Sequence, residues 1–220
     1  MATKKKMLQA AAGNAGGGAG GVLNVEDVFS TYLYEGNGGS QIIQNGINLG
    51  QSFGSGSVEF SDGSSDWIVS QSSSEFAFGT NDFTLECWVY RTSDTGSTNN
   101  IIDLRESDNT ENKPSLAIDS SDKVAYYSNG SWRTVGTTSV PIGQWVHLAV
   151  VRSSGTTKVY YNGTAEGTAF SDSYNYSAST VANIGGAWSG DFDLDGYIAE
   201  ARISDTARYT ANFTTPTAPF

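Results

Sequence analysis

Cysteine is almost absent from this 220-residue chain, which contains Cys87 alone. A single cysteine excludes an intrachain disulfide and a metal site built from cysteine ligands. Long apolar runs are also absent, and without a run of about 18 apolar residues the sequence predicts no membrane span. The lysines near the start are not followed by an apolar stretch, so we expect no secretory signal and synthesis in a reducing cytoplasm.

Basic residues are few, since 12 Lys and Arg stand against 23 Asp and Glu and give a formal net charge of −11. The only charged residues among the first 21 are three lysines, so the rest of the chain carries −14. Binding to nucleic acid requires clustered Lys and Arg that neutralise phosphates. We therefore expect neither nucleic acid nor a membrane as a partner. An acidic body of this kind suits a soluble surface protein or a protein that binds cations.

Proline is scarce, with 4 residues, whereas glycine is abundant, with 26, and aromatic residues make up 12%. This mixture favours short strands joined by turns. Within residues 140–167, the stretches 145–152 and 158–162 are rich in β-branched and aromatic residues. Asn162-Gly163 is a strong hairpin signal, because a type I′ turn needs positive φ at both central positions. We predict a three-strand antiparallel meander here and expect the core to be assembled around it.

Alternation of apolar and polar residues over 81–90 places Phe83, Leu85, Cys87 and Val89 on one face of a strand. Further short strands are predicted at 58–60, 101–104, 115–119, 123–128, 181–185 and 196–204. Ten or more short strands at this spacing predict an all-β fold, a two-sheet antiparallel sandwich.

Composition divides the chain into three parts. Residues 1–21 form a basic, glycine-rich N-terminal arm that cannot bury enough apolar surface to order by itself. An arm laid along an acidic partner and a plain linker both fit this composition. Residues 22–57 contain aromatic anchors and Gly/Asn turns, and we interpret them as a small docking segment. Residues 58–220 form the main domain, which ends in a Thr/Pro-rich stretch with Phe213 and Phe220 as plugs.

Several stretches of the main domain resemble a known family. They are FSDGSSDWI, NDFTLECWVY, IGQWVHLAVVRSSGTTKVYYNGT, IGG and DGYIAEARISDTARYTANFTTPTAPF. This set is similar to laminin G-like, concanavalin A-like jelly-roll domains. The ending GYIAEARISDTARYTANFTTPTAPF and the leading DVFSTYLYEGNGGSQIIQNGINL are similar to segments of tailed-phage virion proteins, especially those of cyanobacterial hosts. The resemblance covers about residues 25–220.

The resemblance implies a jelly roll and a virion structural protein, such as a capsid decoration, cement or surface appendage protein. In that role the arm and the docking segment attach to other virion proteins of the capsid or tail. The attachment residues that we expect are Lys4, Lys5, Lys6, Phe29, Tyr32 and Tyr34. The protein then resides in the virion after assembly in the host cytoplasm, and a homotrimer is compatible with either location.

A second function remains open, namely a tail-fibre or adhesin module that binds host-surface carbohydrate. Sugar rings stack on exposed aromatic faces beside a few fixed polar groups. The aromatic residues in loop-like, polar surroundings are Trp132, Trp188, Tyr174 and Tyr176. A loop tryptophan can equally plug the end of a sandwich, whereas Trp88 and Trp145 lie in predicted strands and are assigned to the core.

Asp191, Asp193 and Asp195 form the one candidate metal site. The run DFDLDG begins like an EF-hand loop, but the twelfth position is Arg202 instead of a bidentate glutamate. An EF-hand is therefore rejected. A looser Ca²⁺ site and a solvated acidic loop are the alternatives, and Ca²⁺ is the only cofactor that the sequence leaves open.

No pattern indicates catalysis, so we expect a protein that is not an enzyme. Glycanases of the resembled superfamily use a Glu-x-Asp-x-x-Glu run, which is missing here. His147 is the sole histidine and alternates with Trp145 and Ala149, which favours a packed sheet residue over a general base. Glu200 stands two residues before Arg202, where ion pairing within a sheet accounts for it. There is also no nucleophile elbow.

Overall fold

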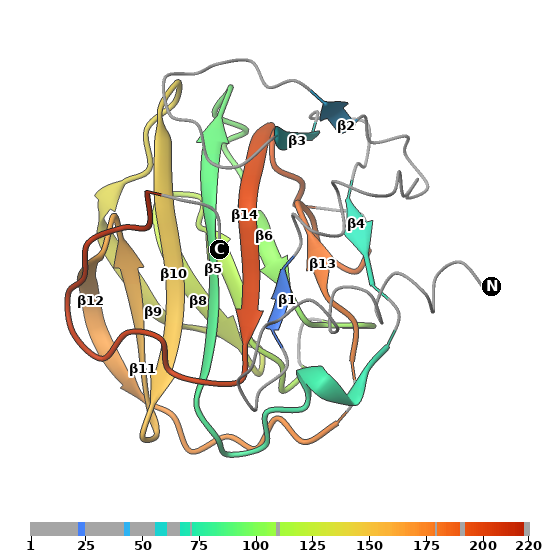
Figure 1. The fold of residues 1–220 in the computed structure, drawn as a ribbon, viewed down its shortest axis with the longest axis vertical. Helices are drawn as coiled ribbons and strands as arrows, with labels where there is room; N and C mark the ends of the chain where they lie inside the picture. The colour runs from blue at the N-terminus through green and yellow to red at the C-terminus, as the bar shows by residue number, and fades with distance from the viewer. Residues whose placement is uncertain are drawn as a thin grey trace.

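The computed structural model describes residues 22–24, 42–44, 56–60, 67–70, 72–108, 111–178, 180–189 and 192–217. These residues form two sheets stacked face to face (Figure 1), and all the paired strands are antiparallel. The only helical element among them is one short 3₁₀ turn, η1 (Ser74–Phe76). The predicted all-β sandwich is confirmed.

The first sheet has eight strands in the order β12-β11-β10-β5-β14-β3-β2, with β1 also paired to β14. It forms the front layer of Figure 1. Its strands are β1 (Val22–Asn24), β2 (Ile42–Gln44), β3 (Gly56–Phe60), β5 (Phe83–Arg91), β10 (Trp145–Ser153), β11 (Thr156–Tyr161), β12 (Thr164–Ser171) and β14 (Gly196–Ser204). Within residues 22–57, set apart above as a docking segment, the described strands β1 and β2 both belong to this main sheet.

The second sheet has six strands in the order β4-β13-β6-β7-β8-β9. Its strands are β4 (Ile68–Val69), β6 (Asn99–Asp103), β7 (Ser115–Ile118), β8 (Lys123–Ser128), β9 (Ser131–Ser139) and β13 (Asn183–Ile184). The strands predicted near 101–104, 115–119, 123–128 and 181–185 correspond to β6, β7, β8 and β13. Strand β9 was not predicted, because its sequence SWRTVGTTS has few apolar residues and its pattern is mostly polar.

The predicted meander is confirmed as β10, β11 and β12, which pair in sequence order. Asn162 and Gly163 have φ values of +46° and +79°, as a type I′ turn requires. The Asn162 side chain adds a hydrogen bond, since its Oδ1 accepts from the His147 amide at 2.8 Å. This bond ties the turn to the neighbouring strand β10.

The core lies between the two sheets and is built by alternation along the strands. Phe83, Leu85, Cys87 and Val89 of β5 are all fully buried in it, as the sequence predicted. Each large apolar side chain that is fully buried stabilises the fold by about 1.5–3 kcal/mol. The opposing layer supplies Ile101, Ile102, Leu104, Leu116, Ile118, Val124 and Tyr126.

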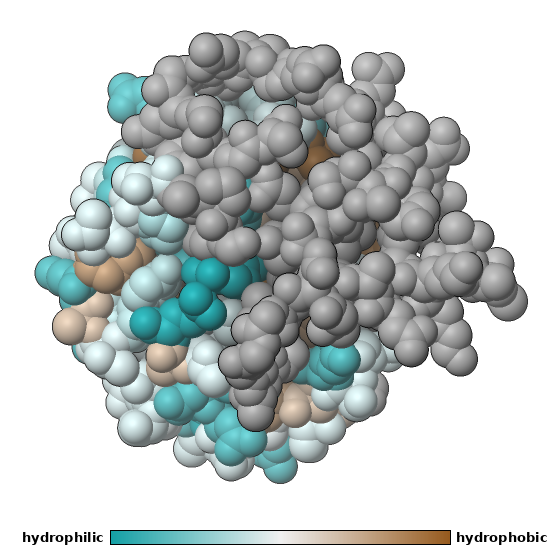
Figure 2. All heavy atoms as spheres, in the orientation of Figure 1, coloured by the Kyte–Doolittle hydropathy of each residue, from teal (hydrophilic) through white to brown (hydrophobic). Residues whose placement is uncertain are grey.

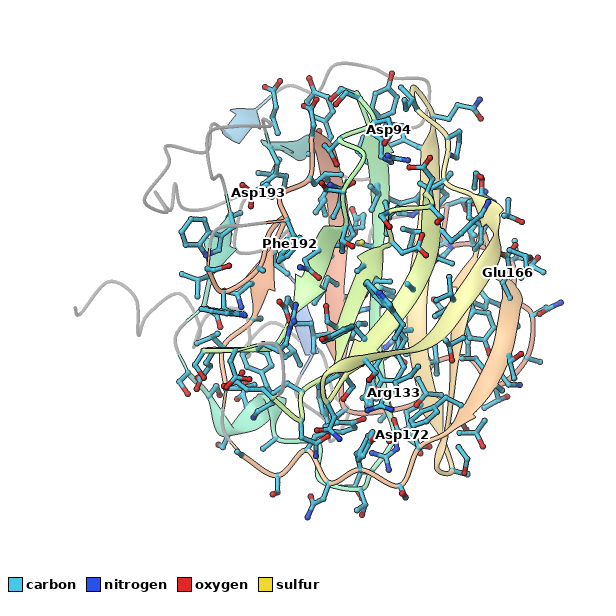
Figure 3. All side chains as sticks on the ribbon, turned by 180° about the vertical axis from the view of Figure 1, so that it is seen from behind. Asp94, Arg133, Glu166, Asp172, Phe192 and Asp193 are labelled. Carbon is cyan, nitrogen blue, oxygen red and sulfur yellow. The ribbon has the colours of Figure 1, made fainter. Side chains whose placement is uncertain are left out.

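The sandwich is joined along one side by the edge strands β9 and β12. Glu166 of β12 accepts hydrogen bonds from the amides of Thr137 and Thr138 at 2.8 and 2.9 Å. Burial raises the pKa of Glu166, but the Thr138 hydroxyl, these amides and the Lys123 charge outweigh it, so the pKa is lowered. Figure 3 labels Glu166 at this edge of the molecule. The carboxylate thereby connects the edges of the two sheets.

The last described stretch, residues 205–217, lies on the outer face of the eight-stranded sheet (Figure 1). Tyr209 and Phe213 pack there on Ala149, Val151 and Tyr160, which form a small apolar cluster separate from the main core. Phe213 also receives a backbone contact, since its amide donates to the Gly163 carbonyl at 2.9 Å. Phe213, which the sequence predicted as a plug, therefore covers part of the outer face of the eight-stranded sheet. Phe220 lies outside the described residues.

Candidate functional site

The outer face of the six-stranded sheet, which faces the reader in Figure 3, is where the most exposed tryptophan in the described part of the chain lies. Val124 and Tyr126 of β8 point into the core, so the alternating residue Tyr127 points outward. Trp132 of β9 is directly opposite Tyr127 in the sheet register. Its side chain is 39% exposed.

Trp132 and Tyr127 meet edge to face, with ring centroids 5.0 Å apart and an interplanar angle of 78°. Such a contact is worth about 0.5–1.5 kcal/mol beyond the area that it buries, and it fixes the orientation of the indole. The guanidinium carbon of Arg105 lies 4.8 Å from the Tyr127 ring centroid. A cation over a tyrosine face is a further attractive contact.

Asp103 at the end of β6 completes this set, which we call the outer row (Asp103, Arg105, Tyr127 and Trp132). Arg105 Nε donates to Oδ1 of Asp103 and Nη2 to Oδ2, both at 2.8 Å. The Asp103 side chain is fully buried and that of Arg105 is 4% exposed. Burial raises the pKa of Asp103, and this effect outweighs the opposing charge of Arg105.

The floor of this sheet face beside the outer row consists of small side chains. Ala117 of β7 and Ala125 of β8 are register partners, and neither belongs to the main core. Both are fully buried. The exposed aromatic surface of this face is therefore at one end, near the β8–β9 turn.

Trp132 was predicted in a loop, and this expectation is corrected: it occupies the second position of strand β9. The strand fixes its backbone more firmly than a loop would. Sequence reasoning missed Tyr127, Arg105 and Asp103. The Asn129-Gly130 pair was the available signal, since a hairpin at that turn would have placed residues 127 and 132 opposite each other.

Trp188, the second predicted tryptophan, lies in the loop between β13 and β14 and is half-buried. Its indole nitrogen is buried and makes no hydrogen bond within the described part of the chain. Less of its ring is open to a ligand than for Trp132. Trp188 and Trp132 are not brought together by any described contact.

Tyr176 is fully buried, so its ring is not on the surface where a sugar could stack. Its hydroxyl bonds with the Tyr126 hydroxyl at 2.5 Å and with Oδ2 of Asp172 at 2.9 Å. Burial and nearby Asp172 raise the pKa of Tyr176 above its usual range, although the bond with Tyr126 opposes the change. This cluster is a hydrogen-bonded part of the interior.

Tyr174 is half-buried, and the Arg133 guanidinium carbon lies 5.0 Å from its ring centroid. The same guanidinium lies 5.5 Å from the ring centroid of Phe170. Arg133 therefore covers these two aromatic rings. Figure 3 labels Arg133 and Asp172 at the same end of the sandwich.

Two of the three predicted metal ligands, Asp193 and Asp195, are described, and Asp191 lies outside the described residues. Oδ2 of Asp195 accepts from the Ser93 hydroxyl at 2.5 Å. The Asp193 carbonyl accepts from the Asn99 side chain at 2.7 Å, which holds the loop on β6. The described residues contain no group of three His, Cys, Asp or Glu side chains that could hold a metal ion.

The predicted attachment residues Lys4, Lys5, Lys6, Phe29, Tyr32 and Tyr34 also lie outside the described residues. They stay predictions. The described part of the chain contains no helix long and apolar enough to cross a membrane.

A buried polar network lies on the outer face of the eight-stranded sheet and was not predicted. Glu86 is fully buried; its Oε1 accepts from Arg202 Nε at 2.8 Å and its Oε2 from the Tyr209 hydroxyl at 2.8 Å. His147 Nε2 lies 3.3 Å from Oε2 of Glu86, and this side chain is also fully buried. His147 is thus a packed sheet residue, as its alternation indicated, inside an ionic network.

The two stacked antiparallel sheets define a β-sandwich of the concanavalin A-like class. The family model described as concanavalin A-like lectin/glucanases superfamily matches residues 61–212. The chain belongs to that family, Laminin_G_3.

Solved structures of other proteins share this fold. One is domain 4 of AbnA, a GH43 extracellular arabinanase from Geobacillus stearothermophilus, in complex with arabinotriose. It is 22% identical, has a TM-score of 0.55, and the match covers 78% of this chain and 85% of that one. At this identity the likeness shows the fold alone.

Another is a mutant of Trypanosoma rangeli sialidase that displays trans-sialidase activity. It is 12% identical with a TM-score of 0.50, and the match covers 77% of this chain but only 28% of the sialidase. The chain therefore spans about a quarter of that enzyme. A search of the curated proteins finds no match.

Proposed function

We propose that this chain is a non-enzymatic carbohydrate-binding module whose ligand lies on the outer face of the six-stranded sheet. The observation that carries the proposal is Trp132, a 39% exposed indole held edge-on to Tyr127. A large ring fixed in orientation binds a sugar face with little loss of side-chain entropy. Beneath this pair, Arg105 is held by Asp103 and lies 4.8 Å from the Tyr127 ring centroid, which helps to fix the position of the two rings.

The fold supports this proposal at the level of the class. The arabinanase domain of the same fold was solved in complex with arabinotriose. A concanavalin A-like sandwich can therefore present a sugar-binding surface, and among the described residues the outer row best suits that role. The binding we propose needs no cofactor.

The non-enzymatic part of the proposal is supported by the surroundings of Glu86 and His147. They form a carboxylate–imidazole pair, and both side chains are fully buried. Tyr209 and Phe213 of the C-terminal stretch pack over them. A substrate cannot reach this pair, so it stabilises the fold instead of transferring protons to a ligand.

The test is a glycan array, followed by calorimetric titration of each glycan that binds, with wild type and Trp132→Ala. We expect Trp132→Ala to weaken binding by about tenfold or more, since one stacking contact is worth about 1.4 kcal/mol. Ile142→Ala is the matched control, because Ile142 is 49% exposed and lies beyond the other end of β9.

Ile142→Ala should bind glycans as tightly as wild type does. Incubation of polysaccharides with the wild-type protein should release no new reducing ends, because the proposed module does not hydrolyse its ligand. Absence of wild-type binding to every glycan would overturn the proposal. Equal binding by wild type and Trp132→Ala would place the site elsewhere, and so would contradict the outer row.

We propose as a second candidate a structural role in a phage virion, with the sandwich displayed outward and residues 1–21 attached to other virion proteins. The charge separation favours it, since the first 21 residues carry three lysines and the rest carries −14. The arm joins the body at Val22, the first residue of β1. The two roles are compatible, because a displayed binding module needs an anchor.

The virion role predicts that removal of residues 1–21 prevents incorporation into particles while β1 and the sandwich remain. Incorporation is measured by the copy number of the chain in purified particles. A triple change of Lys4, Lys5 and Lys6 to Gln keeps the length of the arm and tests its charge alone. Normal incorporation of the shortened chain would exclude the arm as the anchor.

A further inference from the structure

Resting on the proposed sugar-binding role of the outer row, we propose that its ligand is an uncharged glycan, one without carboxylate, sulfate or phosphate groups. A protein that binds an anionic sugar needs a cation whose charge is open to the ligand. The question is therefore whether a positive charge near Trp132 remains uncompensated. The described cations at this end of the sheet are Arg105, Arg133 and Lys113. Lys123 stands on the same face at the other end of β8, where its ammonium group bonds to the Ser139 hydroxyl and acts on the Glu166 carboxylate.

Arg105 is the cation nearest to the aromatic pair, and its charge is compensated. Its Nε and Nη2 each meet one oxygen of Asp103 at 2.8 Å. The Arg105 amide adds a third bond to Oδ1 of Asp103 at 3.2 Å. A bidentate ion pair of this kind is strong and has a fixed orientation, and both of its side chains are buried.

Arg133 follows Trp132 in β9, but its guanidinium is held elsewhere. Nε donates to the Ser128 carbonyl at 2.9 Å and Nη2 to the Asn129 carbonyl at 2.8 Å. The group lies over the rings of Phe170 and Tyr174. Two carbonyls and two ring faces therefore hold this charge away from the outer face.

Lys113 is 7% exposed, and its Nζ donates to the Ala178 carbonyl. Burial lowers the pKa of Lys113, although Glu106 and Glu111 act in the opposite direction. Glu111 is itself close to the row, since its carbonyl accepts from the amide of Asn129 in the β8–β9 turn at 3.1 Å and its carboxylate accepts from the Glu106 amide at 2.6 Å. Carboxylates therefore accompany Arg105 and Lys113, and Arg133 is the one of these three cations that is held by carbonyls and rings alone.

The net charge of residues 22–220 also disfavours the binding of an anionic glycan. Residues 22–220 carry −14, so a polyanion approaching the sheet face is repelled. Such repulsion extends over a Debye length, about 8 Å at physiological ionic strength, and falls as salt rises. An uncharged glycan approaches without this cost and binds by stacking and hydrogen bonds.

The test is calorimetric titration with two sets of probes, namely arabinan, mannan and dextran as uncharged chains, and polygalacturonate and dextran sulfate as anionic ones. We expect wild type to bind an uncharged chain, to lose about tenfold in affinity with Trp132→Ala, and to bind neither anionic chain at 50 mM or 500 mM salt. Dextran against dextran sulfate is the matched comparison, because the backbone is the same.

Asp103→Asn supplies an independent measurement, since it removes the carboxylate that compensates Arg105. This variant should acquire salt-sensitive binding to dextran sulfate that wild type lacks. Circular dichroism and the unfolding midpoint establish that the variant folds. If it does not fold, the comparison of the two probe sets with wild type decides the proposal alone.

Trp132-dependent binding of wild type to an anionic chain, equal to or tighter than to an uncharged one, would overturn this inference and leave the sugar-binding function intact. Binding to no probe and to no glycan of the array would instead overturn the function itself.

Discussion

At the scale of single residues, the burial of the charged side chain of Glu86 could not be predicted from the sequence pattern. Glu86 stands in the middle of the apolar strand FTLECWVYR and is fully buried. Arg202, Tyr209 and His147 reach it from β14, the C-terminal stretch and β10. A buried carboxylate without such partners would cost several kcal/mol. The network thus joins β5, β10 and the stretch 202–209, which are far apart in the sequence.

Glu86→Gln is expected to destabilise the fold by about 3 kcal/mol at pH 7, because Arg202 would remain buried without its counter-charge. Burial raises the pKa of Glu86, but the bond with His147 and the charge of Arg202 outweigh burial and lower it. A lowered pKa stabilises the fold above the unfolded value of about 4.3, and this contribution is lost as pH falls through the folded value. Urea unfolding at several pH values measures both effects.

The wild type should therefore lose stability below about pH 4, whereas Glu86→Gln should depend less on pH in that range. Glu75→Gln is the control, since Glu75 is exposed in η1 and should change stability by less than about 0.5 kcal/mol. Equal stability of wild type and Glu86→Gln at pH 7 would show that the network does not stabilise the fold.

At the scale of elements, the β11–β12 hairpin and the C-terminal stretch depend on each other. Gly163 sits in the turn with φ of +79°, and a Cβ there would lie 2.0 Å from the Phe213 carbonyl oxygen. The Phe213 amide donates to the Gly163 carbonyl at this same point. The turn therefore needs glycine for its own conformation and also for the approach of another segment.

Gly163→Ala should destabilise the fold by about 1 kcal/mol through the positive φ and by a further ~2 kcal/mol through displacement of the C-terminal stretch. The second effect should appear as faster proteolysis after residue 205 and as a lower unfolding midpoint. Gly96→Ala is the matched control, because Gly96 has φ of +64° and no neighbouring atom within 4 Å of the added Cβ. The same loss in both variants would contradict the contact with Phe213.

Elements with strong local patterns were predicted well, and those stabilised from outside were not. Strands β5, β10 and β14 alternate or carry β-branched runs, so their sequences identify them. Strand β9 is largely polar and has no such pattern. It forms because β8 pairs with it on one side and Glu166 of β12 binds its amides on the other. Trp132 was therefore placed in a loop.

At the scale of the whole molecule, the two sheets have different outer faces. The C-terminal stretch covers part of the eight-stranded sheet, whose described surface is mostly pale and teal with small brown patches (Figure 2). The six-stranded sheet carries the outer row on the opposite side of the molecule (Figure 3). A module attached through its N-terminal segment, which enters the eight-stranded sheet at β1, could present the outer row to a ligand.

The sequence by itself determined the all-β class, the meander at residues 140–167 and the buried face of β5, because these depend on local alternation and turn chemistry. It also singled out Trp132. Only the tertiary structure decided which aromatic residues are open: Tyr176 is buried beside Asp172, whereas Trp132 stands against Tyr127. Exposure depends on which segments cover one another, and pairing between distant strands sets that arrangement. The same pairing placed Arg105 against Tyr127 of β8 and so assembled the outer row.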